Sequence, residues 1–549
     1  MLRFKVIAPI VFFLTVFVTN YYFLNSQAFL VHDTTLPARL IELHETLKDG
    51  QFPPRWSKNL GFGYGMPLFQ YYSPFAYFMA EVFYILNFSL LSSLKLTFIS
   101  ISVLAFTGAY FLGKELSNKW GGLVSATVFS FSAYHAVNVY VRGALSEMLA
   151  ISLAPWLLYL LVKNIRIPSK KNYVWLTLGF SVFLLSHNIS ILTFLPFFII
   201  FGLMYAFIEK KLKNLLIVSL SLLHAIAIAA FFLLPAFVTK DVTRVAAITQ
   251  GYFNYKNHFV AFSQLFVPNW GYGASQPDLH DDMSFYFGND VLSLIAVVGI
   301  MTVVKEFKKR TFSKSAVLFL ALLLLLTLSL FLTFTKSRFL WDMFPILGYI
   351  QFPWRFLGVA TVFASALAAY VSKITKAKGV IMALIVMVMV LNTRFFRPEK
   401  LSNFDEVYDV STHSLQTRVS SIIPDYLPKG VSVGKITPAS GPVNPEDGIE
   451  VTINRNKTDL LTAEMNANYD SAIKINKFVF PNWKIKINGQ ETKCSEIDYL
   501  YRCPIQKGKS TLELYWSEKG INQTSNLVSL GGILVLFLFL QLKKIRFSQ

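Results

Sequence analysis

Residues 305–314 read KEFKKRTFSK, and residues 315–335 that follow read SAVLFLALLLLLTLSLFLTFT. The second stretch is apolar almost throughout and is about as long as a helix that crosses a bilayer. The first stretch holds five basic residues and one acidic residue. A basic segment beside a membrane-length apolar run is typical of a cytoplasmic loop in a polytopic membrane protein. This pair predicts the fold class, and the pattern recurs along the chain.

The composition of the whole chain supports the same class. Of its 549 residues, 54% are hydrophobic and 15% are charged, and the mean hydropathy is +0.49. The formal charge of +20 would suggest nucleic acid in a soluble protein. However, residues 395–525 hold 16 basic and 16 acidic residues, so the excess lies between the apolar runs. These values exclude an ordinary cytosolic enzyme, and we expect no nucleic-acid partner.

The basic segments also predict the topology. Seven short segments hold 22 basic and 3 acidic residues, and placing them in the cytoplasm makes the apolar runs cross in pairs. This predicts about twelve transmembrane helices with both termini cytoplasmic. The expected spans are 6–24, 95–113, 120–137, 145–162, 173–187, 189–208, 214–236, 287–304, 315–335, 354–372, 379–394 and 526–542. The first run resembles a signal peptide, but its span length favours an uncleaved anchor.

One apolar run is left out of this count. Residues 68–88, LFQYYSPFAYFMAEVFYILNF, would invert every later basic loop if they crossed the membrane. The run contains Pro74, Glu81 and many aromatic residues, which suit a helix at the headgroup level. We therefore expect an interfacial or re-entrant helix within a first outer loop over 25–94.

The stretch 395–525, which holds equal numbers of basic and acidic residues, is predicted to be an extracytoplasmic β-sandwich. Its alternating, strand-like stretches are Gly448–Arg455, Lys474–Phe480, Trp483–Asn488 and Ser510–Trp516. Asn488-Gly489 is a strong hairpin-turn signal between strands. Residues 1–394 would then form the transmembrane domain, and 526–549 a last span with a basic cytoplasmic tail.

Two cysteines, Cys494 and Cys503, lie in the predicted β domain. An oxidising compartment permits a disulfide between them. The spacing alone does not establish bridging distance, so two free thiols are the alternative.

The polar residues that could carry chemistry lie at the outer ends of the predicted spans. Asp33 follows the first span, where a shielded carboxylate can serve as a general base; the alternative is a helix cap before Pro37. Arg142 and Glu147 flank the start of another span, either as functional charges or as a structural ion pair. Arg355 suits a lipid phosphate; the alternative is a snorkelling arginine in an aromatic belt.

Six further residues are weaker candidates than these four. His32, His187 and Asp342 could be accessory groups at the same outer surface. Asp278, Asp281 and Asp282 are dense enough to suggest a cation, although acids without a ligand framework are a weak metal signal. The sequence has no GxGxxG, Walker A, HExxH or CxxC motif, so nucleotide, zinc-protease and redox chemistry have no motif support. The need for a cofactor stays open, with a divalent cation as one candidate.

The order of motifs resembles a known superfamily. Asp33 after the first span is followed by FPPRW at 52–56 and GFGYGMPLF at 61–69, with later echoes in QFPWRF at 351–356 and FPNWKIKINGQ at 480–490. This order resembles the GT-C glycosyltransferases, which use polyprenyl-phosphate-linked donors. It is more closely similar to a bacterial and archaeal membrane family labelled 6-pyruvoyl-tetrahydropterin-synthase-related. The label does not imply pterin chemistry, because pterin synthases are soluble zinc enzymes whose metal site has no match here.

The resemblance implies a GT-C-like transmembrane domain and a membrane glycosyltransferase in a prokaryotic plasma membrane. Such an enzyme would transfer a sugar from a polyprenyl-phosphate-linked donor to an acceptor at the outer face. Asp33 would act as base or acceptor positioner and Glu147 as a supporting acid, while Arg355 and Arg142 would hold the donor phosphate. The second outer loop lacks a DxD motif, so metal dependence stays open.

Two other functions fit a membrane protein of this kind. A flippase or transporter of lipid-linked glycans would place charges deep along a path through the spans, whereas these ionisable residues collect at the outer ends. A non-catalytic scaffold that presents the β domain would not need the outer acids and arginines.

Overall fold

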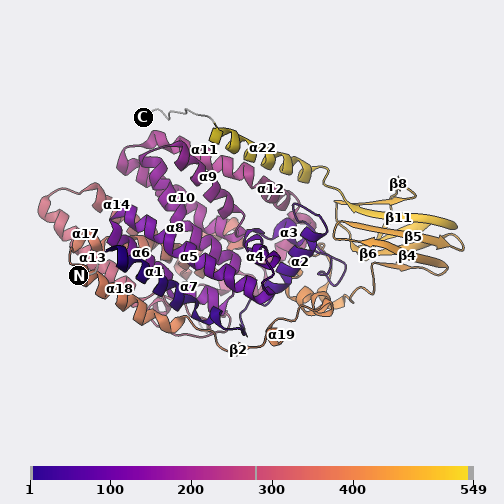
Figure 1. Cartoon of the computed structure of the whole chain (residues 1–549), viewed down its shortest axis with the longest axis horizontal. Helices are drawn as coiled ribbons and strands as arrows, with labels where there is room; N and C mark the ends of the chain where they lie inside the picture. Colours follow the sequence, from indigo (N-terminus) through magenta and orange to yellow (C-terminus); the bar gives the residue numbers. More distant parts are fainter. Residues whose placement is uncertain (1–3, 278–280, 542–549) are drawn as a thin grey trace.

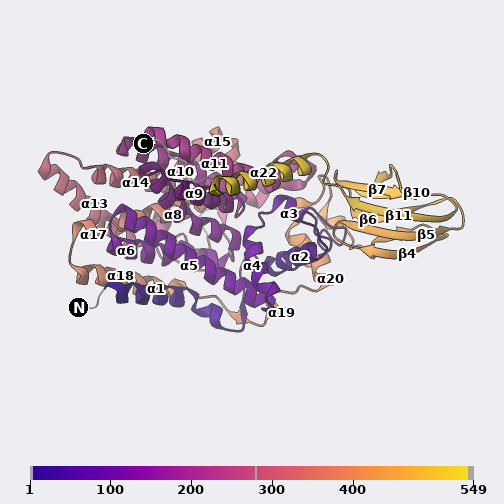
Figure 2. The ribbon, with the colours of Figure 1, turned by 45° about the horizontal axis from the view of Figure 1, so that its top comes forward.

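The computed structural model describes residues 4–277 and 281–541, apart from the side chains of 246 and 247. A helical bundle occupies most of the long axis, and a β domain projects from one end (Figure 1). Helices α2 (Leu36–Lys48) and α3 (Leu68–Tyr71) of the first loop lie between the bundle and the β domain in both views (Figure 2). This arrangement confirms the predicted class, a helical polytopic protein with a C-terminal β domain.

Among the described residues, eight segments are long and apolar enough to cross a membrane. They are Phe4–Leu24 (α1 and the turn after it), Leu90–Leu116 (α5), Leu145–Arg166 (α8), Asn188–Glu209 (α10), Lys314–Phe331 (α14), Pro353–Ile374 (α16 and its flanking turns), Lys378–Phe395 (α18 and the turn after it) and Ile521–Gln541 (α22). A ninth is bent by 73° between α11 (Leu215–Ile228) and α12 (Ala230–Val238).

Three further expected spans coincide with helices that are shorter or more polar than these nine segments. These are α6 (Lys119–Ser130), α9 (Lys170–Leu184) and α13 (Asn289–Lys309). The 12 residues of α6 extend only about 18 Å, which is less than the roughly 30 Å of a hydrocarbon core. The expected number of twelve spans therefore stays a prediction.

The apolar run 68–88 folds into α3 and α4 (Phe75–Ile85) rather than into one long helix. Helix α4 has 11 residues, which is too short to cross a bilayer. Tyr77 and Ala80 on one face are fully buried, while Val82 and Ile85 on the other are more than half exposed. An apolar outer face on a short helix is the form that an interfacial helix needs.

The β domain is a sandwich of two antiparallel sheets. One sheet has the strand order β3-β6-β10-β9 and the other β4-β5-β11-β7-β8. The strands are β3 (Val443–Pro445), β4 (Ile449–Asn456), β5 (Leu460–Ala467), β6 (Ser471–Phe478), β7 (Trp483–Ile487), β8 (Gln490–Glu491), β9 (Ser495–Ile497), β10 (Leu500–Ile505) and β11 (Gly508–Trp516).

Residue alternation explains the sandwich. In β11, Leu512, Leu514 and Trp516 are buried, while Thr511 is exposed and Glu513 is half-buried, as period-2 strands require. Asn488 and Gly489 join β7 to β8 as predicted, and both have positive φ, which a two-residue type I′ hairpin requires. Cys494, directly before β9, and Cys503, within β10, form a disulfide.

The structure differs from the expected domain boundary at residue 395. The sandwich strands begin at Val443, and residues 395–442, the bridging segment, form short helical turns and loops. Within it, β2 (Leu401–Ser402) pairs with β1 (Ala28–Phe29). Its backbone also bonds to the first loop, from Ala439 N to Phe62 O, 2.9 Å. The segment thus packs across the loops of the bundle instead of joining the sandwich.

An aromatic cluster fixes the β domain to the first loop. The indole of Trp56, fully buried, packs against Phe480, Trp483 and Trp516 with ring centroids 5.9, 5.3 and 5.6 Å away. Gly65 has a φ of +76°, and a Cβ there would lie 2.2 Å from the Trp56 indole nitrogen. The FPPRW and GFGYG motifs therefore build the socket on which the β domain rests.

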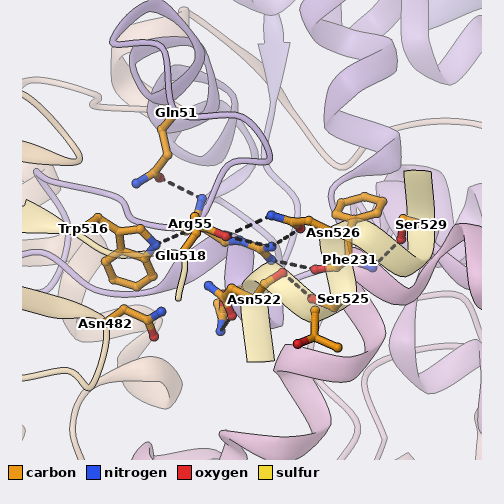
Figure 3. Close-up of polar contacts among 12 residues, drawn as sticks. Gln51, Arg55, Phe231, Asn482, Trp516, Glu518, Asn522, Ser525, Asn526 and Ser529 are labelled. Atoms are coloured by element: carbon orange, nitrogen blue, oxygen red, sulfur yellow. Dashed lines mark hydrogen bonds and ion pairs between the residues drawn. The ribbon is translucent and has the colours of Figure 1, made fainter. Parts of the chain in front are cut away.

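Arg55 joins four parts of the molecule (Figure 3). Its Nη1 donates to the carbonyl of Phe231 in α12 at 2.7 Å, and its Nη2 donates to Asn526 Oδ1 in α22 at 2.9 Å. The same Nη2 lies 3.6 Å from Glu518, which follows the last strand. Gln51 Oε1 accepts from the backbone of Arg55 at 2.9 Å. One fully buried cation thus connects the first loop, the β domain and two membrane helices.

We predict that Arg55→Ala destabilises the fold by about 3 kcal/mol, because it leaves Glu518 and the Phe231 carbonyl without their cation. Thermal unfolding of the detergent-purified protein measures the effect. Arg502→Ala is the matched control, because its ion pair with Glu446 lies on the exposed surface of the β domain and such pairs contribute little. Equal melting temperatures for the two variants would show that Arg55 does not join these parts.

Candidate functional site

A cavity of about 790 Å³ opens among the loops of the bundle. It is lined by the first loop, the turn before α8, the start of α10, α12 with the loop that follows it, residues 346–355 and the bridging segment. Much of the wall is apolar, including Leu192 of α10 and Phe237 of α12. An apolar cavity with a few convergent polar groups is the usual form of a ligand site.

Backbone pairing brings Asp33 and Arg142 together although they are far apart in sequence. The amide of His32 donates to Val141 O at 2.9 Å, and that of Asp33 donates to Arg142 O at 3.0 Å. Gly143 has a φ of +64°, and a Cβ there would lie 2.5 Å from the Val31 side chain. The close approach therefore requires glycine directly after Arg142.

Glu147 lies at the centre of a cationic cluster in the cavity wall. Its Oε2 accepts from Arg142 Nη2 at 2.8 Å and lies 3.3 Å from Arg355 Nε, an ion pair without hydrogen-bond geometry. Its Oε1 accepts from the hydroxyl of Tyr134 at 3.0 Å. The side chain is 4% exposed. The structural ion pair that the sequence offered as an alternative is thus present, and it faces the cavity.

Arg355 enters the cluster from a tight turn before α16 (Phe356–Ala368). Its Nη1 donates to Ile350 O at 2.7 Å and to Gln351 Oε1 at 3.0 Å. The guanidinium lies 5.0 Å from the ring centre of Phe352. Among the described residues, none accepts a hydrogen bond from Nη2 of Arg355. This donor is free to bind a ligand.

Asp33 is held by a residue that the sequence analysis missed. Arg39, on α2, donates from Nη1 to Asp33 Oδ1 at 2.9 Å and to Oδ2 at 2.7 Å. The hydroxyl and the amide of Thr35 donate to Oδ1 at 2.6 and 3.3 Å. Thr35 is the N-cap residue of α2 and no side-chain cap bond forms there, so the helix cap offered as the alternative for Asp33 is not present. A signal for Arg39 existed, because it is a charged residue in the otherwise apolar run Leu36–Ile41 at the start of α2.

Asp425 is a second residue that the sequence analysis missed. Its carboxyl lines the cavity from the bridging segment. It lies in the short turn η15 (Pro424–Tyr426), where Tyr426 stacks on Tyr71 with ring centres 5.7 Å apart. Burial raises the pKa of the Asp425 carboxyl, and the charges of Arg39 and Arg244 partly oppose this rise. Its side chain has no hydrogen-bond donor among the described residues.

These groups form a row of alternating charge, which we call the charge row. In order, its members are Asp425, Arg39, Asp33, Arg142, Glu147 and Arg355. Each carries a charge opposite to that of the next and interacts with it electrostatically. Among the described residues, the carboxyl of Asp425 at one end accepts no hydrogen bond, and Nη2 of Arg355 at the other end donates none.

Of the accessory candidates, the two histidines lie at the cavity and Asp342 does not. His32 and His187 line the same cavity; His32 Nε2 lies 2.9 Å from Tyr272 O, and His187 Nδ1 lies 2.8 Å from Ser190 Oγ. Asp342 is an exposed residue away from the cavity lining, where it pairs with Arg338 at 3.3 Å.

Of the acids proposed for a cation, those that the structure describes are not gathered into a ligand set. Asp278 lies outside the described residues. Asp281 accepts from the amide of Gln276 at 2.8 Å and from the side chain of Gln264 at 2.9 Å. In the part of the chain that the structure describes, no three His, Cys, Asp or Glu side chains are grouped as metal ligands.

The chain is similar in sequence to a protein family and to a bacterial protein. The model of a family described as "6-pyruvoyl-tetrahydropterin synthase related domain; membrane protein" matches residues 69–396, more than half of the chain. An uncharacterized protein of Lactococcus lactis subsp. cremoris (strain MG1363) is 27% identical over 304 residues, which cover 53% of this chain and 48% of that protein. The chain thus spans about half the length of this relative.

Two solved structures are similar to part of the chain. Arabinofuranosyltransferase AftD from Mycobacteria is 12% identical, with a TM-score of 0.41 over 73% of this chain and 27% of AftD. The apo oligosaccharyltransferase of Archaeoglobus fulgidus is 14% identical, with a TM-score of 0.44 over 74% of this chain and 55% of that protein.

We predict that Glu147→Gln destabilises the protein by about 3 to 5 kcal/mol, because two buried guanidinium groups lose their shared carboxylate. Asp342→Asn is the matched control, since that carboxyl is exposed and its ion pair is screened by water. Melting temperatures in one detergent compare the two variants. A Glu147→Gln protein as stable as the control would show that the cluster is not held by this charge.

Proposed function

The chain belongs to the family of membrane proteins described as 6-pyruvoyl-tetrahydropterin synthase related, and we propose that it is a membrane glycosyltransferase. It transfers a sugar from a polyprenyl-phosphate-linked donor to an acceptor hydroxyl at the outer face of the membrane. The observation that carries this proposal is the charge row. One cavity offers a free guanidinium donor at Arg355, carboxyls at Asp33 and Asp425, and an apolar wall beside them.

The donor binds at the arginine end of the row. A phosphodiester carries one negative charge. Arg142 and Arg355 are both paired with Glu147, while Asp33, which also acts on Arg142, is paired with Arg39. This leaves about one net positive charge, and guanidinium groups bind phosphate through paired hydrogen bonds. The apolar side chains of α10 and α12 line the same cavity and suit a lipid chain.

The acceptor binds beside Asp33. Arg39 and Thr35 hold both oxygens of this carboxyl in place, and fixed geometry is what an orienting group needs. In this proposal Asp33 accepts a hydrogen bond from the acceptor hydroxyl and aims its oxygen at the anomeric carbon of the donor sugar. A membrane scaffold would not need these groups to face a cavity. A transporter would need charges along the depth of its path.

Asp33→Asn should lower the transfer rate by at least about 100-fold, because the neutral amide orients the hydroxyl poorly. Donor binding should stay near the wild-type value, while the melting temperature should fall, because the buried Arg39 loses its charged partner. The rates are therefore compared at a temperature where both proteins are folded. Purified protein with a panel of radiolabelled polyprenyl-phosphate sugars measures transfer, and Asp241→Asn, an exposed acid after α12, is the control. Normal transfer by Asp33→Asn would remove Asp33 from the site.

Arg355→Ala should weaken binding of the donor roughly 10- to 100-fold, because a hydrogen-bonded charge contact to the phosphate is lost. Arg355→Lys should recover only part of this affinity, since a point charge replaces a planar fork. Equilibrium binding of polyprenyl phosphate measures both, with the exposed Arg338→Ala as control. Unchanged affinity in Arg355→Ala would place the phosphate elsewhere.

A further inference from the structure

Glycosyl transfer releases a proton from the acceptor hydroxyl, and some group near the anomeric carbon must accept it. Asp33 has little capacity left for this proton. Its Oδ1 already accepts from Thr35 and Arg39, and its Oδ2 accepts from Arg39 at 2.7 Å. Protonating this carboxyl would break its contact with a buried guanidinium, which is costly.

Asp425 has the opposite surroundings. It lines the same cavity, and its carboxyl receives no hydrogen bond from the described residues. The charged groups that act on it are Arg39 from α2 and Arg244 from η5 (Arg244–Thr249). Each is engaged elsewhere, Arg39 with Asp33 at 2.7 Å and Arg244 with Val431 O at 2.8 Å. Asp425 can therefore take a proton without breaking an ion pair.

The bridging segment holds Asp425 at this position. Arg244 N donates to Leu427 O at 3.1 Å, and Lys429 N donates to Val242 O at 2.9 Å. The stacked rings of Tyr426 and Tyr71 lie beside these bonds, and the Tyr71 hydroxyl donates to Thr239 O at 2.8 Å. The turn that carries Asp425 is thus fixed to the loop that follows α12.

We propose that Asp425 is the catalytic base, which accepts the proton of the acceptor hydroxyl, while Asp33 only orients that hydroxyl. This inference rests on the proposed glycosyltransferase function. In the step, the acceptor oxygen forms a bond to the anomeric carbon. The bond from that carbon to the donor phosphate oxygen breaks, and its electron pair leaves on the phosphate held at Arg355. The proton moves from the acceptor hydroxyl to the carboxylate of Asp425.

Burial tunes Asp425 for this task. Its raised pKa brings the carboxyl nearer to the pH at which a general base works best. The base is active when it is deprotonated, so the transfer rate should fall as the pH drops through this raised pKa. The acidic limb of the pH–rate profile should then lie above the ordinary range of an aspartate.

Transfer assays at several pH values test the assignment. Asp425→Asn should lose about 10²- to 10⁴-fold in rate together with the acidic limb, while its binding of polyprenyl phosphate stays normal. Asp425→Glu should regain part of the rate. Asp405→Asn, an exposed acid of the same bridging segment, should leave rate and profile unchanged. An Asp425→Asn enzyme with the rate and the acidic limb of the control would overturn the assignment.

Arg244→Gln separates a base from a merely structural residue. The glutamine keeps an uncharged polar group at this position, but the positive charge that lowers the pKa of Asp425 is gone. The acidic limb should therefore move to higher pH. An acidic limb that stays in place would count against Asp425 as the titrating group.

A labelling experiment tests Asp425 even if no donor in the panel is used. A hydrophobic carbodiimide reacts with protonated carboxyls, and mass spectrometry locates the product. Asp425 should be labelled up to a higher pH than Asp405 in the same wild-type sample. Identical labelling curves would overturn the inference. Absence of transfer by the wild-type protein with every donor would instead count against the proposed function.

Discussion

The shared carboxylate of Glu147 is the constraint on which the site depends. A buried charge at the edge of a membrane is costly unless it is paired and hydrogen-bonded, and Glu147 satisfies this requirement with two arginines and a tyrosine. The pairing fixes the turn of Arg142 against the start of α8 and the entry of Arg355 into α16. Since the turn at Arg142 also binds the backbone of Asp33, the first loop takes its position from the same cluster.

The first loop, the β domain and the bridging segment are connected to the same cavity by further buried contacts. Trp56 and Arg55 join the first loop to the β domain, and Arg55 also binds α12, a wall of the cavity. The bridging segment then returns from α18 across the loops and adds Asp425 to the charge row. The β domain is therefore connected to the wall of the cavity through buried contacts rather than through a flexible linker. This connection gives the domain a means of holding the cavity in shape.

The sequence predicted the features that depend on local pattern. Apolar runs and basic segments gave the membrane class, and period-2 alternation with Asn488-Gly489 gave strands close to β4, β6, β7 and β11. It also selected Asp33, Arg142, Glu147 and Arg355, which the structure brings to one cavity. It missed Arg39 and Asp425, because their importance comes from contacts with residues distant in the chain. The bridging segment was assigned to the sandwich because its balanced charge resembles that of the strands that follow.

A structure of the protein with a bound polyprenyl phosphate tests the central claim most directly, namely that the charge row binds the donor at its arginine end. The account predicts a phosphate oxygen about 2.8 Å from Nη2 of Arg355, with the lipid chain along α10 and α12. A phosphate held by Lys240 or by the basic segments between the spans, with the Arg355 donor still free, would contradict it.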